Sequence, residues 1–316
     1  MISVIIPSYN RATFIKRALN NISEQTFKDV EVIIVDDGST DNTREIIDGL
    51  KDNYGFDIAY YFQKNQGAAA ARQSGVNNAK GDFLAFFDSD DLWHTDYLSS
   101  LIHALEFSKL DWIYCPVERR NLATNELVSK NSFYPNGCPR NFVKIAHQVG
   151  KGIYALDLNA AIEVQLKNGI YMGFQNTLFK KQIFEKVKIP NLRIGQDRLM
   201  ALVLLKNKFH GGFIEQVLAT VYEHEGNTTS SGSNDRKKVV FTYTQLIMGY
   251  EKYTDYVLLD KAEEKIIYKK IANFYFWHLG YSEPIKRVAL TYMWKGIKRD
   301  PLSFSKLKSF FIRIFK

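Results

Sequence analysis

The chain has 316 residues, of which 46% are hydrophobic and 24% charged, a balance that excludes a disordered or membrane-embedded protein. No run approaches the roughly 18 consecutive apolar residues of a membrane span, and two cysteines are too few for a disulfide framework, so a cytoplasmic protein is expected. The formal net charge of +8 favours an anionic partner such as a nucleotide, a nucleic acid or an acidic lipid surface.

Apolar runs alternate with amphipathic stretches over the first 117 residues. The runs that predict strands are residues 3–6, which end at Pro7, then 31–35, 58–62, 83–87 and 112–115. Helical spacing follows the first three runs, from Arg11 to Ile22, around residues 46–50, and in the alanine-rich stretch 68–79, whose small side chains allow close packing. This alternation indicates a parallel sheet with helices on both faces.

Polar turns follow four of these strands, at residues 7–10, 36–41, 65–67 and 88–91. The carboxyl ends of parallel strands meet at one edge of a sheet, so these turns are expected to converge. If the fourth strand lies beside the first, the topological switch point falls between Tyr9 and Asp88. The predicted fold class is therefore α/β, with a Rossmann-like, mostly parallel sheet followed by a helical C-terminal region.

The fourth strand leads directly into Asp88, Ser89, Asp90 and Asp91. Carboxylates so close in sequence repel one another, and a divalent cation relieves that repulsion by binding to their oxygens. A solvated acidic turn has the same composition. The acidic cluster by itself therefore leaves both a metal site and a surface turn open.

Periodicity weakens between residues 118 and 169, where no element is assigned. A helix is expected at 199–205, preceded by Asp197, which suits either helix capping or a functional role. A strand at 219–222 leads to His224, and a lone histidine is usually structural. The polar run 230–234 predicts a boundary near residue 235. Residues 1–234 would form one domain, with a donor half (1–117) and an acceptor half (118–234), and residues 235–316 a helical region.

The motifs at the predicted strand ends resemble those of the family 2 glycosyltransferases, enzymes with the A-type nucleotide-sugar fold (GT-A). The matching residues are Val4-Ile5-Ile6-Pro7-Ser8-Tyr9-Asn10, Val35-Asp36-Asp37-Gly38-Ser39-Thr40-Asp41, Asn65-Gln66-Gly67 with Ala71, Arg72 and Gly75, and Asp88-Ser89-Asp90-Asp91. They cover most of residues 1–95. A looser likeness continues to His224, with Asn227 and Ser230, and fades after residue 235.

The resemblance implies inverting, metal-dependent transfer of a sugar from a nucleotide-diphosphate donor. The implied nucleotide-binding residues are Pro7, Ser8, Tyr9, Asn10, Asp36, Arg72, Asp88 and Ser89. Asp90 and His224 would bind Mn²⁺ or Mg²⁺ (the DXD motif), and a carboxylate such as Asp36 can accept the N–H of uracil, which favours a UDP-linked donor. Asp197 would be the general base. Gln196 departs from the pattern, because the family usually has glutamate there.

The resemblance also implies transfer of a hexose or N-acetylhexosamine to a glycan or lipid-linked glycan, in the biosynthesis of a bacterial surface polysaccharide such as capsule or lipopolysaccharide. One alternative is a non-catalytic sugar-nucleotide or glycan-binding protein whose site decayed at Gln196. Another is a sugar-phosphate nucleotidyltransferase, although residues 7–11 lack the glycine-rich loop expected there. A nucleic-acid binder is disfavoured, since no nucleic-acid-binding motif is present and the basic residues are spread along the chain.

The last fifteen residues, 302–316, have helical spacing and several basic side chains. The predicted apolar stripe consists of Leu307, Phe310, Phe311, Ile314 and Phe315. The basic residues around it are Lys306, Lys308, Arg313 and Lys316. Such a helix lies either on an anionic membrane surface, here the inner face of the cell membrane, or against its own domain. The stripe is compatible with both.

Overall fold

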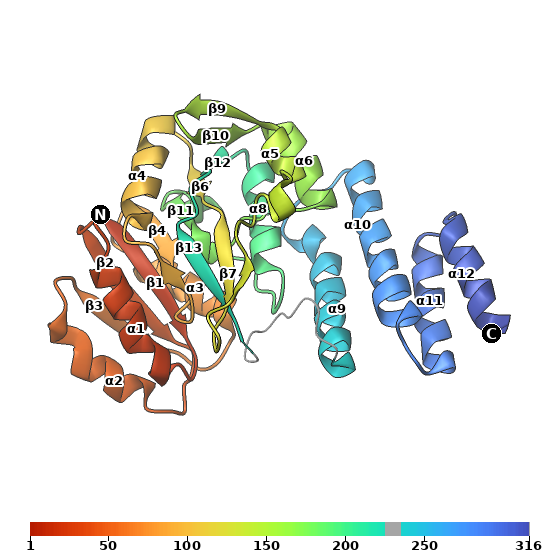
Figure 1. Ribbon diagram of the computed structural model, residues 1–316, viewed down its shortest axis with the longest axis horizontal. Coiled ribbons are helices and arrows are strands. Elements are labelled where there is room, and N and C mark those ends of the chain that lie inside the picture. The colour runs from red at the N-terminus through yellow and green to blue at the C-terminus, as the bar shows by residue number, and fades with distance from the viewer. Residues whose placement is uncertain (225–234, 316) are drawn as a thin grey trace. The chain divides into compact units, whose positions relative to one another are not determined.

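The computed structural model describes residues 1–224 and 235–315, which form two compact units (Figure 1). The first unit comprises Met1–Asn191 and Gln196–Glu225, and the second comprises Leu192–Gly195 and Gly226–Lys316. The predicted linker at 230–234 lies outside the described residues, as do Asn227 and Ser230.

A large sheet forms the centre of the first unit. Among the described residues it has nine strands, in the order β3-β2-β1-β4-β11-β6-β12-β10-β9. Their bounds are β1 Ile2–Ser8, β2 Val30–Asp36, β3 Ile58–Phe62, β4 Phe83–Phe86, β6 Trp112–Tyr114, β9 Ala146–Gly150, β10 Ile153–Leu156, β11 Thr177–Lys180 and β12 Gly211–Ile214. Of these described strands, β11 and β10 run against the rest. The predicted α/β class with a mostly parallel sheet is confirmed.

The strand order reverses beside β1, as predicted. β1 pairs in parallel with β2 along its whole length, from Ile2 with Val30 to Ser8 with Asp36, but with β4 only as far as Ile5. The predicted end of the first strand at Pro7 is wrong, because β1 continues to Ser8. Proline lacks an N–H donor, and Pro7 lies beyond the part of β1 that pairs with β4, where a strand tolerates it.

Helices cover both faces of this sheet. Successive side chains of a strand point to opposite faces: on β1, Val4 and Ile6 join the core cluster that includes α1, α2 and α4, whereas Ile5 faces Gly75 of α3. The helices of the first unit are α1 Ala12–Ser23, α2 Thr43–Leu50, α3 Ala68–Asn78, α4 Tyr97–Ser108, α5 Asn141–Lys144, α6 Leu158–Lys167, α7 Ile183–Lys186 and α8 Gln196–Lys206.

Gly75 is where α3 packs closely on β1, as its alanine-rich sequence predicts. A Cβ atom at Gly75 would lie 2.3 Å from Cγ2 of Ile5. We expect Gly75→Ala to destabilise the chain by about 1–3 kcal/mol, because overpacking forces the helix and the strand apart. Gly49→Ala in α2 is the matched control: its Cβ would meet nothing within 4 Å, and alanine stabilises a helix by up to roughly 1 kcal/mol. Urea unfolding of the two variants measures the difference, and equal midpoints would contradict the packing.

The stretch 118–169 holds elements that the sequence did not reveal, among them two strands of a second sheet. That sheet, four-stranded among the described residues, has the order β5-β13-β7-β8. Its strands are β5 Leu92–Trp93, β7 Val117–Asn121, β8 Leu127–Ser129 and β13 Ala219–Glu223. β7 is polar after Val117 and β8 has only three residues, of which Leu127 and Val128 are exposed, so neither shows the apolar alternation that marks a half-buried strand.

The second unit is helical in its described residues. Its helices are α9 Arg236–Glu251, α10 Lys261–Asn273, a π-helical turn at Phe274–Tyr281, α11 Lys286–Arg299 and α12 Phe304–Phe315. Phe276, Met293 and Ile297 form a small core there. In the part of the chain that the structure describes, no helix has both the length and the apolar character needed to cross a bilayer.

Candidate active site

Hydrogen bonds join the first two polar loops at the carboxyl edge of the sheet. The backbone N–H of Asn10 donates to Ser39 Oγ at 2.8 Å, and Asn10 Oδ1 accepts from the backbone N–H of Thr40 at 2.8 Å. Asp41 Oδ2 accepts from the backbone N–H of Ala12 at 3.2 Å, at the start of α1. The convergence expected from a parallel sheet is thus present, and these bonds hold the loop after β1 against the loop after β2.

The paired aspartates after β2 have different partners. Asp36 is buried, and its carboxylate accepts from the hydroxyl of Tyr60 and from the backbone N–H of Ser39, both at 2.8 Å. Asp37 accepts from the backbone N–H groups of Gln66 at 2.9 Å and Gly67 at 2.7 Å. Asp37 therefore holds the loop that begins α3. Each Asp36 oxygen keeps a further lone pair with which a ligand N–H could bond.

The strand end at residues 7–10 combines buried and exposed groups. Ser8 Oγ is buried and has no hydrogen-bond partner among the described residues, whereas the Tyr9 side chain is about half exposed. Asn10 has a positive φ of 53°, which asparagine tolerates better than most residues. A buried hydroxyl without a hydrogen-bond partner lowers the stability of the fold, and a bound ligand could supply the partner that the Ser8 hydroxyl lacks.

Arg72 on α3 links the end of β4 to the start of α8. Its guanidinium donates to Asp88 Oδ1 at 2.6 Å and to Gln196 Oε1 at 2.9 Å. The guanidinium carbon also lies 5.0 Å from the ring centre of Phe174, and Nε has no partner among the described residues. Arg72 thus brings together two residues that are 108 positions apart.

Asp90 and His224, the predicted metal ligands, lie next to each other. Asp90 Oδ2 is 3.1 Å from His224 Nε2 and 3.2 Å from a guanidinium nitrogen of Arg11. Arg17 donates to the backbone carbonyls of Asp90 and Asp91 and fixes this turn. Ser89 of the same turn is buried.

This donor set fits a divalent cation that is shared with a ligand. Among the described residues, no cluster of three or more His, Cys, Asp or Glu side chains could hold a metal by itself. Mg²⁺ in nucleotide sites is commonly held by one or two side chains, with phosphate oxygens and water completing the octahedron. Asp90 supplies a carboxylate and His224 an imidazole, which suits Mn²⁺ better than Mg²⁺.

Asp91, the third carboxylate, is buried and has a structural role. Its Oδ1 accepts from the backbone N–H of Tyr222 at 3.2 Å and so ties the acidic turn to β13. Burial, followed by the charges of Asp88 and Asp90, raises the pKa of Asp91 well above its usual range.

Asp197 lies in the first turn of α8, beside Gln196, and its Oδ1 accepts from the backbone N–H of Arg198 at 2.9 Å. Burial raises the pKa of this carboxyl group, while the bond from Arg198 and the positive charges of Arg198 and Arg72 act in the opposite direction. A carboxylate with a raised pKa at the start of a buried helix suits proton transfer.

Arg11 and Arg17 were not predicted as site residues, and neither was Asp37, although it belongs to the motif after β2. Arg11 directly follows the first polar turn and Arg17 lies two helical turns further on, so their position next to the predicted sheet edge was the available signal. Their partners were not predictable, because the bonds from Arg17 to Asp90 and from Arg11 to Asp90 join residues far apart in sequence.

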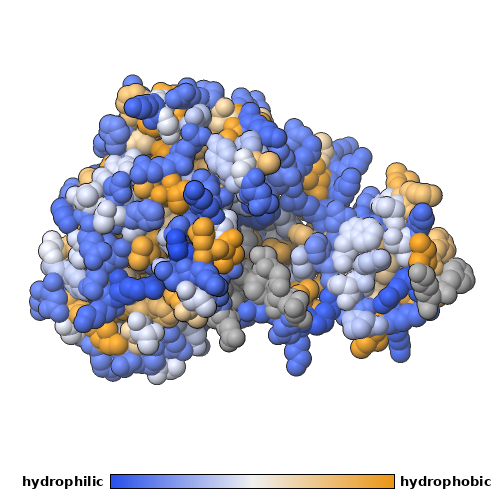
Figure 2. All heavy atoms as spheres, in the orientation of Figure 1, coloured by the Kyte–Doolittle hydropathy of each residue, from blue (hydrophilic) through white to orange (hydrophobic). Residues whose placement is uncertain are grey.

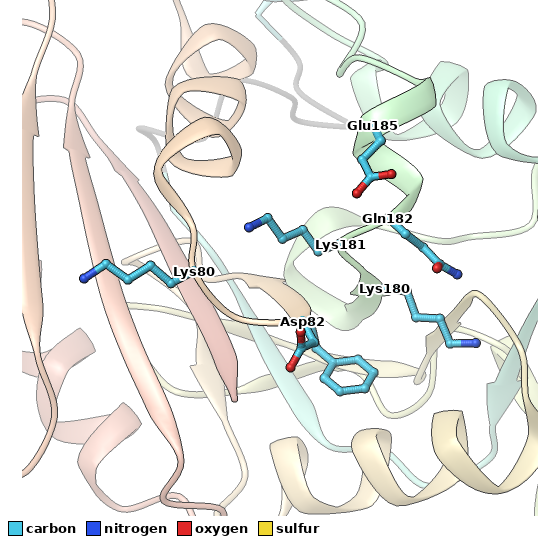
Figure 3. Close-up of a pocket in the computed structure, with 7 residues that line it drawn as sticks. Lys80, Asp82, Lys180, Lys181, Gln182 and Glu185 are labelled. Atoms are coloured by element: carbon cyan, nitrogen blue, oxygen red, sulfur yellow. The ribbon is translucent and has the colours of Figure 1, made fainter.

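A shallow pocket of about 380 Å³ lies at the other end of β4 (Figure 3). Lys80 and Asp82 precede β4, Lys180 ends the antiparallel β11, and Lys181, Gln182 and Glu185 complete the labelled lining. Lys181 donates to the carbonyl of Ala79 at 2.6 Å. Because its charges are mixed and none of the converging motifs reaches it, this pocket is not the candidate site.

Known structures share the fold. The S. aureus protein TarS, residues 1–349 in complex with UDP-GlcNAc, aligns with a TM-score of 0.64 at 16% identity, over 94% of this chain and 81% of that one. The Pyrobaculum calidifontis mannosyltransferase PcManGT in complex with GDP-Man and Mn²⁺ aligns with a TM-score of 0.59 at 17% identity, over 97% of this chain and 77% of that one. At such low identity the likeness concerns the fold, which is the GT-A type.

Relatives found by sequence have higher identity to the chain than these structures. The chain is 30% identical over 247 residues to the putative teichuronic acid biosynthesis glycosyltransferase TuaG of Bacillus subtilis, covering 78% of this chain and 88% of TuaG. It is 40% identical over 114 residues to WfaP of Escherichia coli, a UDP-Glc:alpha-D-GlcNAc-diphosphoundecaprenol beta-1,3-glucosyltransferase, covering 36% of this chain and 45% of WfaP. With two other curated relatives the match covers about a third of the relative's length: 33% of an uncharacterized glycosyltransferase of Nostoc, over 107 residues, and 37% of one of Rickettsia felis, over 247 residues. Residues 3–186 match Glycosyl transferase family 2, and the chain belongs to that family.

Proposed function

We propose that this chain transfers a hexose or N-acetylhexosamine from a UDP-linked donor, with inversion, to a glycan or lipid-linked glycan of a bacterial surface polysaccharide. The observation that carries the proposal is the approach of Asp90 to His224, 3.1 Å apart at the carboxyl edge of the sheet. A carboxylate and an imidazole are ligand types of a cation site that diphosphate oxygens would complete.

The donor would bind along the converging loops. Asp36 and the loop Pro7–Ser8–Tyr9–Asn10 would hold the base, and Arg72, Asp88 and Ser89 the ribose and diphosphate. A Mn²⁺ or Mg²⁺ ion bound to Asp90 and His224 would neutralise the charge of the leaving diphosphate. Arg11, whose guanidinium lies 3.2 Å from Asp90, is placed to add a second positive charge there.

Asp197 would act as the general base. Its carboxylate would take the proton of the acceptor hydroxyl while that oxygen forms a bond to the anomeric carbon and the bond from this carbon to the diphosphate oxygen breaks. The electron pair of the broken bond leaves with UDP. A single displacement of this kind inverts the anomeric centre.

The relatives support the substrate class. WfaP is named for a UDP-Glc donor and a diphosphoundecaprenol-linked acceptor, TuaG for teichuronic acid biosynthesis, and TarS was solved with UDP-GlcNAc. PcManGT was solved with GDP-Man, so the choice of base needs its own test.

A panel of UDP-linked hexoses and N-acetylhexosamines, with GDP-mannose as the comparison, tests the proposal by release of nucleoside diphosphate with and without Mn²⁺. We expect one UDP-sugar to be hydrolysed slowly and only with metal, and UDP to raise the melting temperature more than GDP does. Release from GDP-mannose alone would contradict the donor assignment. Stabilisation by UDP without release from any donor or transfer to any acceptor would indicate a binding protein.

A further inference from the structure

The C-terminal helix α12 docks on its own unit through one side. Leu307 and Phe310 pack against the small core of Phe276, Met293 and Ile297. Lys306 is only 2% exposed and its Nζ lies 2.6 Å from Asp300 Oδ2. Two residues of the stripe predicted from the sequence therefore face protein. The side chain of Phe315, and residue 316, lie outside the described part of the chain.

An exposed side of α12 next to the packed one is apolar as well. Leu302 before the helix is 94% exposed, and Phe304, Phe311 and Ile312 are 78%, 54% and 46% exposed. Phe304, Lys308 and Phe311 are spaced i, i+4, i+7, so they share one helical face. We call Leu302, Phe304, Lys308, Phe311 and Ile312 the C-terminal face. Single exposed apolar residues are ordinary, but several on one short helix mark an interaction surface.

Aromatic and basic side chains of α11 adjoin this helix. Trp294 is about half exposed, stacks on Phe310 with ring centres 5.9 Å apart, and has Lys298 Nζ 5.7 Å from its ring. Figure 2 shows orange side chains among blue ones at the surface of the C-terminal helices. Tryptophan and lysine with exposed phenylalanine are the composition of a helix that lies at a lipid–water interface.

The positive charge of the chain is concentrated in this C-terminal region. Residues 235–316 contain seventeen Lys and Arg against eight Asp and Glu, a balance of +9, while residues 1–234 contain 25 against 26, a balance of −1. The formal charge of +8 thus comes entirely from the region that carries the exposed apolar face. A second copy of the chain would bring like charge against like, whereas an anionic surface would be attracted.

We propose that the C-terminal face binds the surface of an anionic lipid bilayer, with α12 in the plane of the interface and the exposed side chains of Lys308 in α12 and of Lys295 and Lys298 in α11 at the lipid head groups. This inference deepens the proposed function and rests on it in one respect: an enzyme held at the membrane would meet a lipid-linked acceptor more often. The stripe predicted from the sequence is divided in the structure: Leu307 and Phe310 pack on the unit, whereas Phe311 is exposed together with Phe304 and Ile312.

Vesicle co-sedimentation of the full chain tests the proposal. We expect binding to vesicles that contain phosphatidylglycerol, weaker binding at high salt, and little binding to pure phosphatidylcholine. The variant Phe304→Ser/Phe311→Ser/Ile312→Ser should bind the anionic vesicles at least roughly tenfold less. The matched control Leu258→Ser/Tyr268→Ser removes two exposed side chains of the same unit, 90% and 54% exposed, and should bind like the wild type. Substitution is preferable to truncation, which would uncover Phe276 and Met293.

Equal binding by the triple variant and the wild type, or equal binding to anionic and zwitterionic vesicles, would overturn the proposal. The proposal would also be overturned if the triple variant lost a dimer in light scattering while its vesicle binding stayed unchanged. A second copy of the chain would then be the partner of the C-terminal face. Release of UDP in solution separates the two hypotheses: we expect the triple variant to release it like the wild type. Vesicle binding without release by any variant would refute the catalytic proposal and leave the membrane proposal standing.

Discussion

Asp197→Asn is expected to lower the turnover number by about 10²–10⁴-fold, the usual contribution of a general base. The amide keeps the shape of the side chain but cannot accept the acceptor's proton. Donor binding should change little, because the described contacts of Asp197 are with α8 and not with the acidic turn after β4. Steady-state kinetics with the donor found in the panel, and calorimetric titration of UDP with Mn²⁺, measure both quantities. A collapse of UDP affinity would instead place Asp197 in the donor site.

The pH profile gives a second readout of the same residue. Burial raises the pKa of Asp197, and the base works only when ionised, so activity should fall as the pH drops through a value above the ordinary aspartate pKa of about 3.9. Gln196→Glu would place another negative charge beside Asp197, raise its pKa further and move the acidic limb to higher pH. An unchanged limb in Gln196→Glu would mean that a different group is titrating.

Asp90→Ala is expected to abolish the contribution of Mn²⁺ to UDP binding, a loss on the order of 10²-fold or more, since a cation bridging to a diphosphate is worth several kcal/mol. Metal-free UDP binding should be retained or become tighter, because Arg11 and His224 lose the carboxylate that lies 3.2 Å and 3.1 Å from them. The ratio of UDP affinities with and without Mn²⁺ isolates the metal from general damage to the site.

Asp82→Ala is the matched control for this variant. Asp82 is an exposed aspartate just before the same strand, at the edge opposite the candidate site. Its replacement should leave the Mn²⁺ dependence of UDP binding as in the wild type. If Mn²⁺ still tightened UDP binding as strongly in Asp90→Ala as in Asp82→Ala, Asp90 would not be a metal ligand.

The sequence by itself determined the fold class, five strands and three helices of the first 117 residues and the convergence of the polar turns, but it did not reveal β5 and α4. Each of these depends on information that is local in the chain: apolar runs, helical spacing and turn residues, combined with the rule that parallel strands end at one edge. The helix expected at 199–205, which is α8, and the strand before His224 were predicted for the same reason.

Only the tertiary structure decided which side chains meet. Asp90 and His224 are 134 residues apart and Arg72 and Gln196 are 124 apart, and no local pattern encodes such pairs. The polar strand β7 forms where β13 offers an edge to pair with, and β8 then pairs with β7, which propensity cannot reveal. In α12 both sides are apolar, so the sequence could not tell which side packs. In the structure Leu307 and Phe310 pack against the small core. Phe304, Phe311 and Ile312 stay exposed, because a helix can bury only one of its sides against one neighbour.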